Sequence, residues 1–263
     1  MSAPLVSVCV PTRNQASYLG DALAGALAQD VDLELLVHDD ASTDETAAVV
    51  ARAEDSRIRY VRHERPLGVA VNRNTCLAAA RGRYVAWLDS DDEYLPGMLE
   101  RQLAVLENGP EVGLVHGGFH LVGAGGERLP DWPAPFERDV VEPAREAFRQ
   151  LIASNELTTS TVVARRSHHE AARFRPGVGA SSSDWDAWLR IARHVGVAYT
   201  AAPVARYRQH PETISRATSP SGERLRCDIA VVRHVLRRHA RGLPEFSRIA
   251  SAARAALAVK ALD

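Results

Sequence analysis

The sequence has 263 residues but a single lysine, Lys260, so arginine carries almost all of its positive charge. We attribute this first to composition bias and second to a preference for phosphate ligands. Acidic and basic residues nearly cancel and leave a formal net charge of -1. A general nucleic-acid-binding protein would be clearly basic, so no nucleic-acid partner is expected.

Cysteine is also scarce. Only Cys9, Cys76 and Cys227 occur, far apart and without metal-binding or CxxC spacing. A disulfide framework is therefore not expected, whereas a reducing compartment is. Residues 1–14 lack the charged start and long apolar run of a signal peptide, and no apolar stretch approaches the roughly 20 residues of a membrane-spanning helix. We expect a cytoplasmic location and leave open a peripheral contact with the inner face of the membrane.

The first half of the chain alternates between short apolar runs and segments in which apolar residues have helical spacing. The runs predict strands at 5–10, 33–37, 58–61 and 84–88. The spacing predicts helices at 17–27, 42–53, 69–80 and 96–108. Ser17 is expected to cap the first helix, and Ser42 with Glu45 to form a capping box for the second. This alternation is typical of an α/β fold with a mostly parallel sheet flanked by helices.

The second half of the chain is less regular. Its patterns predict extended segments at 112–122, 158–164 and 197–208, a long loop at 123–141 and a helix at 185–194. His168 and His169 are interpreted as surface residues. We assign residues 1–216 to one domain and residues 217–263 to a helical extension. The extension can pack on the domain, form a homodimer contact or touch a membrane surface, and packing is the interpretation we favour.

Polar clusters at 11–12, 39–40 and 89–91 follow three of the predicted strands. The carboxyl ends of parallel strands meet at one edge of a sheet, and ligands bind there. The last cluster, together with Asp92, places three carboxylates within four positions, a crowding that a divalent cation such as Mg²⁺ or Mn²⁺ would stabilise. An acidic turn in which Asp92 caps the next helix explains the same spacing equally well.

Two further features are ambiguous when they are taken singly. Ser183-Asp184 before a helix is an ordinary N-cap signature, and Asp186 lies close enough to rival Asp184 as a catalytic carboxylate. No G-x-G-x-x-G follows the first strand, so a dinucleotide cofactor is not expected.

Taken together, six segments resemble the motifs of family 2 glycosyltransferases with the GT-A fold, a Rossmann-type architecture. They are 6–14 (VSVCVPTRN), 38–44 (HDDASTD), 68–74 (GVAVNRN), 88–92 (LDSDD), 183–190 (SDWDAWLR) and 207–210 (YRQH). The resemblance covers about residues 5 to 216. It departs from the family pattern at His38, at Ala41, where the family has glycine, and at Ser183, where it has glutamate. Ala41 is expected to cost little if its turn needs no positive φ.

The resemblance implies roles for individual residues. The implied nucleotide-binding set is Pro11, Thr12, Asn14, Asp39, Arg73, Asp89 and Ser90. In this set, Asp39 would hydrogen-bond the base and Arg73 would reach the nucleotide or its phosphates. Asp91 would bind the metal directly, and His210 would be a further metal or diphosphate contact. Asp184 would be the catalytic base, and Arg206 or Arg208 would stabilise charge on the diphosphate.

The resulting hypothesis is an inverting, metal-dependent transfer of a sugar from a nucleoside-diphosphate sugar, with UDP favoured, to a hydroxyl acceptor. The cofactor would be Mn²⁺ or Mg²⁺, and the acceptor a glycan, a lipid-linked sugar or a natural product. One alternative is a sugar nucleotidyltransferase, although residues 11–18 contain neither the glycine nor the lysine of such enzymes. Another is a non-catalytic module that binds a nucleotide sugar, which the departure at Ser183 supports.

Overall fold

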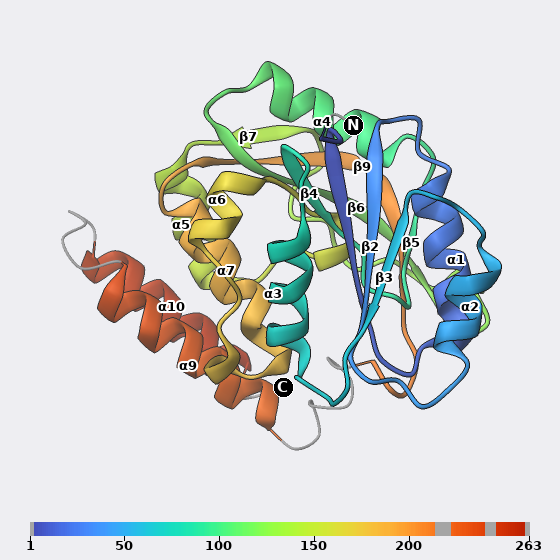
Figure 1. Ribbon diagram of the computed structural model, residues 1–263. Coiled ribbons are helices and arrows are strands. Elements are labelled where there is room, and N and C mark those ends of the chain that lie inside the picture. Colours follow the sequence, from blue (N-terminus) through green and yellow to red (C-terminus); the bar gives the residue numbers. More distant parts are fainter. Residues whose placement is uncertain (1–2, 214–221, 240–245, 261–263) are drawn as a thin grey trace.

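The computed structural model describes residues 3–213, 222–239 and 246–260 (Figure 1). Its centre is a nine-stranded sheet in the order β3-β2-β1-β4-β8-β6-β9-β5, with β7 paired to β9. The strands are β1 Val6–Thr12, β2 Leu33–Asp39, β3 Ile58–Arg62, β4 Tyr84–Trp87, β5 Glu93–Tyr94, β6 Val112–Val122, β7 Val140–Glu142, β8 Val163–Arg165 and β9 Gly196–Arg208. Strands β3, β2, β1 and β4 run parallel, as do β6 and β9, while β8 is antiparallel to both β4 and β6.

The helices cover both faces of this sheet. They are α1 Ala16–Leu27, α2 Thr46–Arg52, α3 Val69–Ala79, α4 Met98–Asn108, α5 Ala144–Ala153, α6 Arg166–Ala171, α7 Ser183–Ala192, α9 Glu223–Arg238 and α10 Phe246–Lys260. Short 3-10 turns lie at Thr159–Thr161, Pro176–Val178 and Ala180–Ser182. The predicted α/β fold with flanking helices and helical C-terminal segments is confirmed.

Alternation along the strands builds two hydrophobic cores. On β1, Val6, Val8 and Val10 face the core under α1 and α4, while Cys9 faces the core under α3, α5 and α7. Central strands are thus apolar on both sides, as strands of covered parallel sheets are. The carboxyl ends of β1, β2 and β4 are thereby fixed at one edge of the sheet.

The C-terminal helices pack against the second of these cores. Val231, Val232 and Val235 of α9 and Ile249 and Ala253 of α10 are buried in it. Figure 1 shows α9 and α10, in orange to red, beside α5 and α7. The packing interpretation is therefore confirmed for the described part of the extension. No helix among the described residues has the length and apolar character needed to cross a bilayer.

Several local expectations were wrong. Helix α1 begins at Ala16 after Gln15, so Ser17 lies inside it, and α2 begins at Thr46 without a capping box. The Ser42 hydroxyl instead accepts a hydrogen bond from the Asn14 backbone N–H. Residues 144–153, for which no helix was predicted, form α5.

The segment at 158–164 contains only the start of a strand. The Thr161 hydroxyl and backbone N–H both donate to the Thr158 carbonyl, which closes a tight turn before β8. His169 is fully buried rather than exposed, and Trp87 Nε1 donates to its Nε2 at 2.9 Å. The aromatic side chains around it, Trp87, Phe174 and Trp188, explain why this imidazole belongs to the core.

Two buried histidines make the stability of the fold depend on pH. Burial lowers the pKa of His116 to about 3 and that of His169 to about 4. The unfolded chain binds protons at these positions below pH about 6.5, whereas the folded chain does not until pH about 4 or lower. The contribution of these histidines to the free energy of unfolding is therefore largest above pH 6.5 and falls as the pH drops towards 4, by up to about 1.4 kcal/mol per pH unit for each histidine.

We expect His116→Phe to flatten this decline between pH 6.5 and 4.5, because it removes one titrating group, while His169 and His38, whose pKa burial also lowers to about 4, remain. Urea unfolding at half-unit pH steps measures the slope. Tyr199→Phe is the matched control, since it changes the ring that packs on His116 and leaves the imidazole in place. Equal slopes for the parent protein and His116→Phe would contradict the assignment.

Candidate active site

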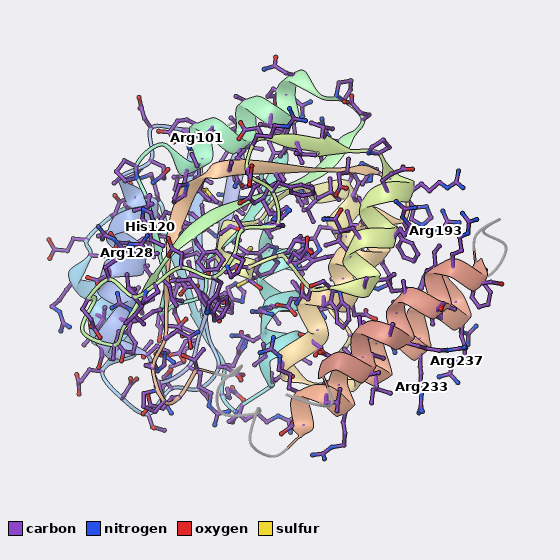
Figure 2. All side chains as sticks on the ribbon, turned by 180° about the vertical axis from the view of Figure 1, so that it is seen from behind. Arg101, His120, Arg128, Arg193, Arg233 and Arg237 are labelled. Carbon is purple, nitrogen blue, oxygen red and sulfur yellow. The ribbon has the colours of Figure 1, made fainter. Side chains whose placement is uncertain are left out.

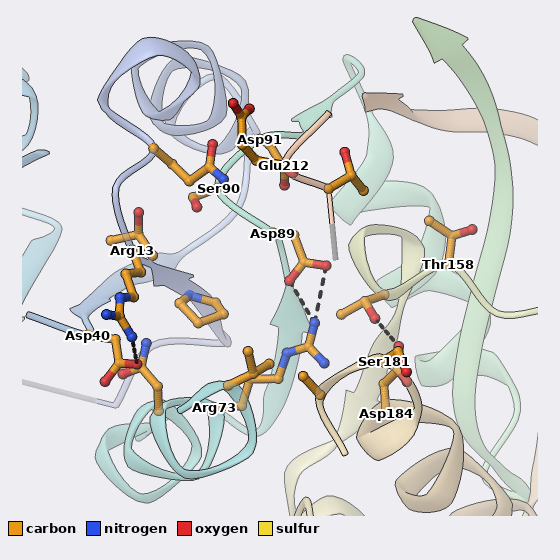
Figure 3. A pocket seen from close by; sticks show the side chains of 18 of the residues that line it. Arg13, Asp40, Arg73, Asp89, Ser90, Asp91, Thr158, Ser181, Asp184 and Glu212 are labelled. Atoms are coloured by element: carbon orange, nitrogen blue, oxygen red, sulfur yellow. Dashed lines mark hydrogen bonds and ion pairs between the residues drawn. The ribbon is translucent and has the colours of Figure 1, made fainter. Parts of the chain in front are cut away.

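A cavity of about 560 Å³ opens at the carboxyl edge of the sheet. Among the predicted site residues, its lining includes Pro11, Thr12, Asn14, Arg73, Asp89, Ser90, Asp91 and Asp184. Figure 3 shows Arg73 and Asp89 between Asp40 and Arg13 on one side and Asp184 on the other. The predicted convergence of the strand-end clusters is thus visible in the geometry, although four predicted residues, Asp39, Arg206, Arg208 and His210, do not line the cavity.

The loop after β1 forms the first wall of the cavity. The Thr12 hydroxyl is buried in this lining and has no hydrogen-bond partner in the described structure. Asn14, in a left-handed conformation with φ 52°, accepts from the Thr43 backbone N–H at 2.8 Å. This loop is therefore braced against the loop after β2, and the Thr12 oxygen remains available for a ligand.

The two acids after β2 have different roles. Asp39 is fully buried, and its carboxylate accepts from the Ser42 N–H at 2.7 Å and from the Tyr60 hydroxyl at 2.6 Å. Asp39 does not line the cavity, so the side chain that can meet a ligand there is Asp40. Asp40 accepts from the backbone N–H groups of Leu67 and Gly68 before α3. The role in base binding that the resemblance implied for Asp39 stays a prediction, and Asp40 is the neighbouring acid that lines the cavity.

The turn between these acids and α2 requires a left-handed residue. Ala41 has a φ of 59°, so the condition under which alanine would cost little here, a turn without positive φ, is not met. A side chain in this conformation costs about 1 kcal/mol relative to glycine. The neighbouring bonds of Asp39 and Asp40 hold the strained residue in place.

Arg73 supplies a buried cation in the middle of the cavity. Its Nη2 donates to both oxygens of Asp89, at 2.9 and 3.2 Å, and its guanidinium lies 5.4 Å from the centre of the Phe174 ring. Burial raises the pKa of Asp89, and the charge of Arg73 opposes this rise. Arg73 Nε has no partner in the described structure, so the guanidinium keeps one donor free.

The other two acids of the strand-end cluster differ in position: Asp91 lines the cavity, whereas Asp92 is buried. Asp91 lines the cavity, and its Oδ2 lies 2.9 Å from His210 Nε2. His210 is 1% exposed, and the hydrogen bond with Asp91 raises its pKa. In the described ranges, no group of three or more histidine, cysteine, aspartate or glutamate side chains forms a metal-binding cluster.

Asp92 is held by two hydrogen bonds. It accepts from the Ser160 hydroxyl at 2.5 Å and from the Arg208 backbone N–H at 2.8 Å. Burial raises the pKa of this carboxyl well above its usual range. The next helix begins at Met98 after Gly97, so Asp92 does not cap it. The acidic-turn interpretation was therefore wrong in this respect.

Asp184 and Asp186 are distinguished clearly. Asp184 lines the cavity at the start of α7, and its Oδ2 accepts from the Thr159 hydroxyl at 2.9 Å. Asp186 is 0% exposed and is paired with Arg175 and Arg190, each at 2.9 Å. A carboxylate enclosed in this way cannot reach a substrate, so Asp186 is removed as a rival base.

Neither arginine predicted to meet the diphosphate lines the cavity. Arg206 is paired with Glu93, and Arg208 packs over Tyr18 while its Nε donates to the Asp91 carbonyl. The cationic lining comes from Arg73, Arg13 and Arg224 instead. Arg224 is supplied by α9, which sequence patterns gave no reason to associate with the site.

The family model for glycosyl transferase family 2 matches residues 7–170, more than half of the chain. The chain belongs to glycosyl transferase family 2. This membership agrees with the resemblance inferred from the motifs and with the positions of those motifs around one cavity.

Among the relatives of this family 2 chain is the UDP-Glc:alpha-D-GlcNAc-diphosphoundecaprenol beta-1,3-glucosyltransferase WfgD of Escherichia coli. The two are 34% identical over 119 residues, 45% of this chain and 47% of WfgD. The chain spans about a third to a half of the length of the curated relatives it matches most strongly.

Solved structures confirm the fold. Residues 1–349 of TarS of S. aureus in complex with UDP-GlcNAc match with a TM-score of 0.75 at 18% identity, covering 93% of this chain and 70% of that TarS fragment. The mannosyltransferase PcManGT of Pyrobaculum calidifontis in complex with GDP-Man and Mn²⁺ matches with a TM-score of 0.63 at 21% identity, covering 100% of this chain and 76% of PcManGT.

The two acids of α7 in this family 2 chain should differ sharply in their effect on stability. Asp186→Asn leaves two arginines without their buried partner, so we expect a loss of about 3–5 kcal/mol in the free energy of unfolding. Asp184→Asn should change it by less than about 1 kcal/mol, because the asparagine oxygen can still accept from Thr159. Urea unfolding of both variants measures the difference, and equal losses would contradict the division of roles.

Proposed function

We propose that this family 2 domain transfers a sugar from a nucleoside-diphosphate sugar to a hydroxyl acceptor, with inversion at the anomeric carbon and with a divalent metal ion. The observation that carries the proposal is the position of the Asp184 carboxylate. It lies on the cavity wall across from Asp40, with the Arg73–Asp89 pair between them. A base at one end of a polar cavity and nucleotide-binding groups at the other suit a transfer reaction.

The donor would lie along the edge of the sheet. The free Thr12 hydroxyl, Asn14 and Asp40 offer hydrogen bonds to the nucleoside, and Arg73, with its unused Nε, faces the next part of the cavity. Arg13 and Arg224 add positive charge for the phosphates. A UDP sugar is favoured, because WfgD is named for UDP-Glc and TarS was solved with UDP-GlcNAc.

Asp91 and His210 fit a divalent ion. The Asp91 carboxylate lines the cavity, and its Oδ2 lies 2.9 Å from the buried imidazole nitrogen of His210, a donor pair that suits Mn²⁺. Mg²⁺ is commonly held by one or two carboxylates together with substrate phosphates. PcManGT was solved with Mn²⁺. When bound, the ion would neutralise the charge that develops on the diphosphate.

Asp184 would act as the base. The acceptor oxygen forms its bond to the anomeric carbon while the bond from that carbon to the diphosphate oxygen breaks. The electron pair of the broken bond leaves with the diphosphate, and the acceptor proton goes to Asp184. The Thr159 hydroxyl and the Trp185 backbone N–H donate to the carboxylate and fix it at the start of α7. A single displacement of this kind inverts the anomeric centre.

Family membership favours sugar transfer over nucleotidyl transfer, and Asp184 favours an enzyme over a binding module. The acceptor would be a glycan, a lipid-linked sugar or a natural product. We also predict a cytoplasmic location, a peripheral contact with the inner face of the membrane and a homodimer.

A donor screen tests the proposal directly. With Mn²⁺ and candidate acceptors, we expect release of the nucleoside diphosphate from at least one of UDP, GDP and dTDP sugars. Asp184→Asn should lower kcat by about 10²- to 10⁴-fold, because the acceptor proton loses its base. Binding of the free nucleoside diphosphate, measured by calorimetry, should not change. A parent protein that turns over no donor contradicts the enzyme proposal, and a variant of full activity contradicts the assigned base.

The metal proposal has its own test. Asp91→Asn removes a charged ligand, so the Mn²⁺ concentration that gives half-maximal turnover should rise at least about tenfold. Glu93→Gln is the matched control, since its carboxylate pairs with Arg206 outside the cavity lining. Turnover that persists unchanged after chelation with EDTA would show that no metal is needed.

A further inference from the structure

We propose that Trp132 is the binding platform for a pyranose ring of the acceptor, so that the acceptor is a saccharide chain rather than an aglycone. The inference rests on the proposed function for the direction of transfer. It starts from an aromatic cluster that neither the motifs nor the catalytic proposal uses. Phe119 of β6, Trp132 of the long loop and Tyr207 of β9 form this cluster.

The three rings support one another edge to face. The ring centres of Phe119 and Trp132 are 5.9 Å apart, those of Trp132 and Tyr207 are 5.7 Å apart, and those of Phe119 and Tyr207 are 5.5 Å apart. Both Trp132 and Tyr207 line the cavity. Two sheet strands thus hold the tryptophan at the wall of the active site.

Trp132 is the tryptophan that remains exposed. It is 50% exposed, whereas Trp87, Trp185 and Trp188 are 0%, 1% and 0% exposed. A half-exposed indole that lines the cavity as part of an aromatic cluster leaves apolar surface that a ligand can cover. The other large exposed apolar side chains of the described structure, Val61 and Val141, do not line this cavity.

The loop holds Trp132 in place through its neighbour. The Asp131 carboxylate accepts from the Arg128 guanidinium and from the Leu121 N–H at 2.8 Å. The Leu129 N–H donates to the Leu121 carbonyl at 2.9 Å, which folds the loop back on β6. Figure 2 shows Arg128 beside His120 of β6, on the opposite side of the molecule from Arg233 and Arg237 of α9. A platform that is ordered before the ligand arrives binds with a smaller entropic cost.

The order of the strands indicates which substrate meets this platform. The proposed nucleoside groups follow β1 and β2, and the Asp89–Asp91 segment follows β4. Strands β6 and β9, which carry the aromatic cluster, lie further along the sheet in the same direction. A donor laid from β2 across β4 therefore points its sugar towards the aromatic side, so the next ring beyond it belongs to the acceptor.

The chemistry of the cluster favours a sugar ring. One face of a pyranose presents several C–H groups, and an indole offers a large flat apolar surface of low conformational entropy. Polar groups that line the same cavity, Thr158, Ser181 and Asp184, can hydrogen-bond the ring hydroxyls, and Asp184 can receive the acceptor proton. A saccharide offers both a C–H face for the indole and hydroxyls for these polar groups, whereas an apolar aglycone lacks the hydroxyls.

Tryptophan fluorescence tests the platform without requiring turnover. Because the other tryptophans are buried, quenching by acrylamide should report mainly on Trp132. We expect at least one of cellotetraose, chitotetraose, maltotetraose and a mannose oligomer to protect this fluorescence, with no donor present. The Trp132→Phe variant should lose both the quenching and its protection. Absence of protection by every saccharide of this panel, or equal protection in Trp132→Phe, overturns the proposal.

Kinetics with a protecting saccharide supply the second measurement. Trp132→Ala should raise the acceptor KM at least about tenfold, and Trp132→Phe should restore part of the loss. The KM for the donor and the slow hydrolysis of the donor without acceptor should not change. Val61→Ala, an exposed apolar residue away from the cavity, is the control and should behave as the parent protein.

The two proposals fail in different ways. If the parent protein releases no nucleoside diphosphate from any donor but a saccharide still protects Trp132, the proposed transfer fails and the saccharide site stands. If turnover is normal and Trp132→Ala leaves the acceptor KM unchanged, or changes the donor KM instead, the platform assignment fails and the transferase proposal stands.

Discussion

One buried guanidinium, that of Arg73, organises the charges of the active-site cavity. It donates to Asp89, and the charges of Asp89, Asp184 and Asp91 all raise its pKa. A single cation among three carboxylates leaves the cavity with an excess of negative charge. That excess opposes the approach of a diphosphate, which is itself anionic. A divalent ion at Asp91 and His210 would resolve the conflict, and the arginines at the cavity rim, Arg13 and Arg224, reduce it further.

This arrangement depends on parts of the chain that are distant in sequence. Asp92 connects the segment after β4 to β9 by accepting from Ser160 and from the Arg208 backbone. The same connection brings His210, just beyond β9, to Asp91. In the sequence, Asp92 resembles a further metal ligand. Its hydrogen bonds instead help to position His210 beside Asp91. Asp92 does not line the cavity, because it is buried and both of its carboxylate oxygens accept hydrogen bonds.

Sequence patterns predicted the parts of the site that follow from strand periodicity and motif order. They located Thr12, Asp89 and Asp91 at one edge because parallel strands end together. Arg73 and Asp184 lie on helices, and only the resemblance of their segments to family motifs associated them with the site. Sequence patterns could not distinguish Asp39 from Asp40, because β2 is buried on both faces and alternation gives no preferred side. The directions of Arg206 and Arg208 depend on partners more than 100 residues away, Glu93 and the Asp91 carbonyl. Trp132 lies in a loop without periodic pattern, so only tertiary contacts reveal its place.

The C-terminal helices contribute to the cavity, so the site is not confined to residues 1–216. Dividing the chain after residue 216 separates a domain from an extension, yet α9 contributes Arg224 to the cavity. Asp228 of α9 accepts from the buried Ser182 hydroxyl at 2.7 Å, directly before the helix that presents Asp184. Gly179, with φ 90°, lies so close to Cys227 that an added Cβ would fall 2.1 Å from its Sγ. The turn that begins α7 is thus shaped by α9, and the position of the proposed base depends on both segments. Described by its contacts, the extension is a structural part of the active site.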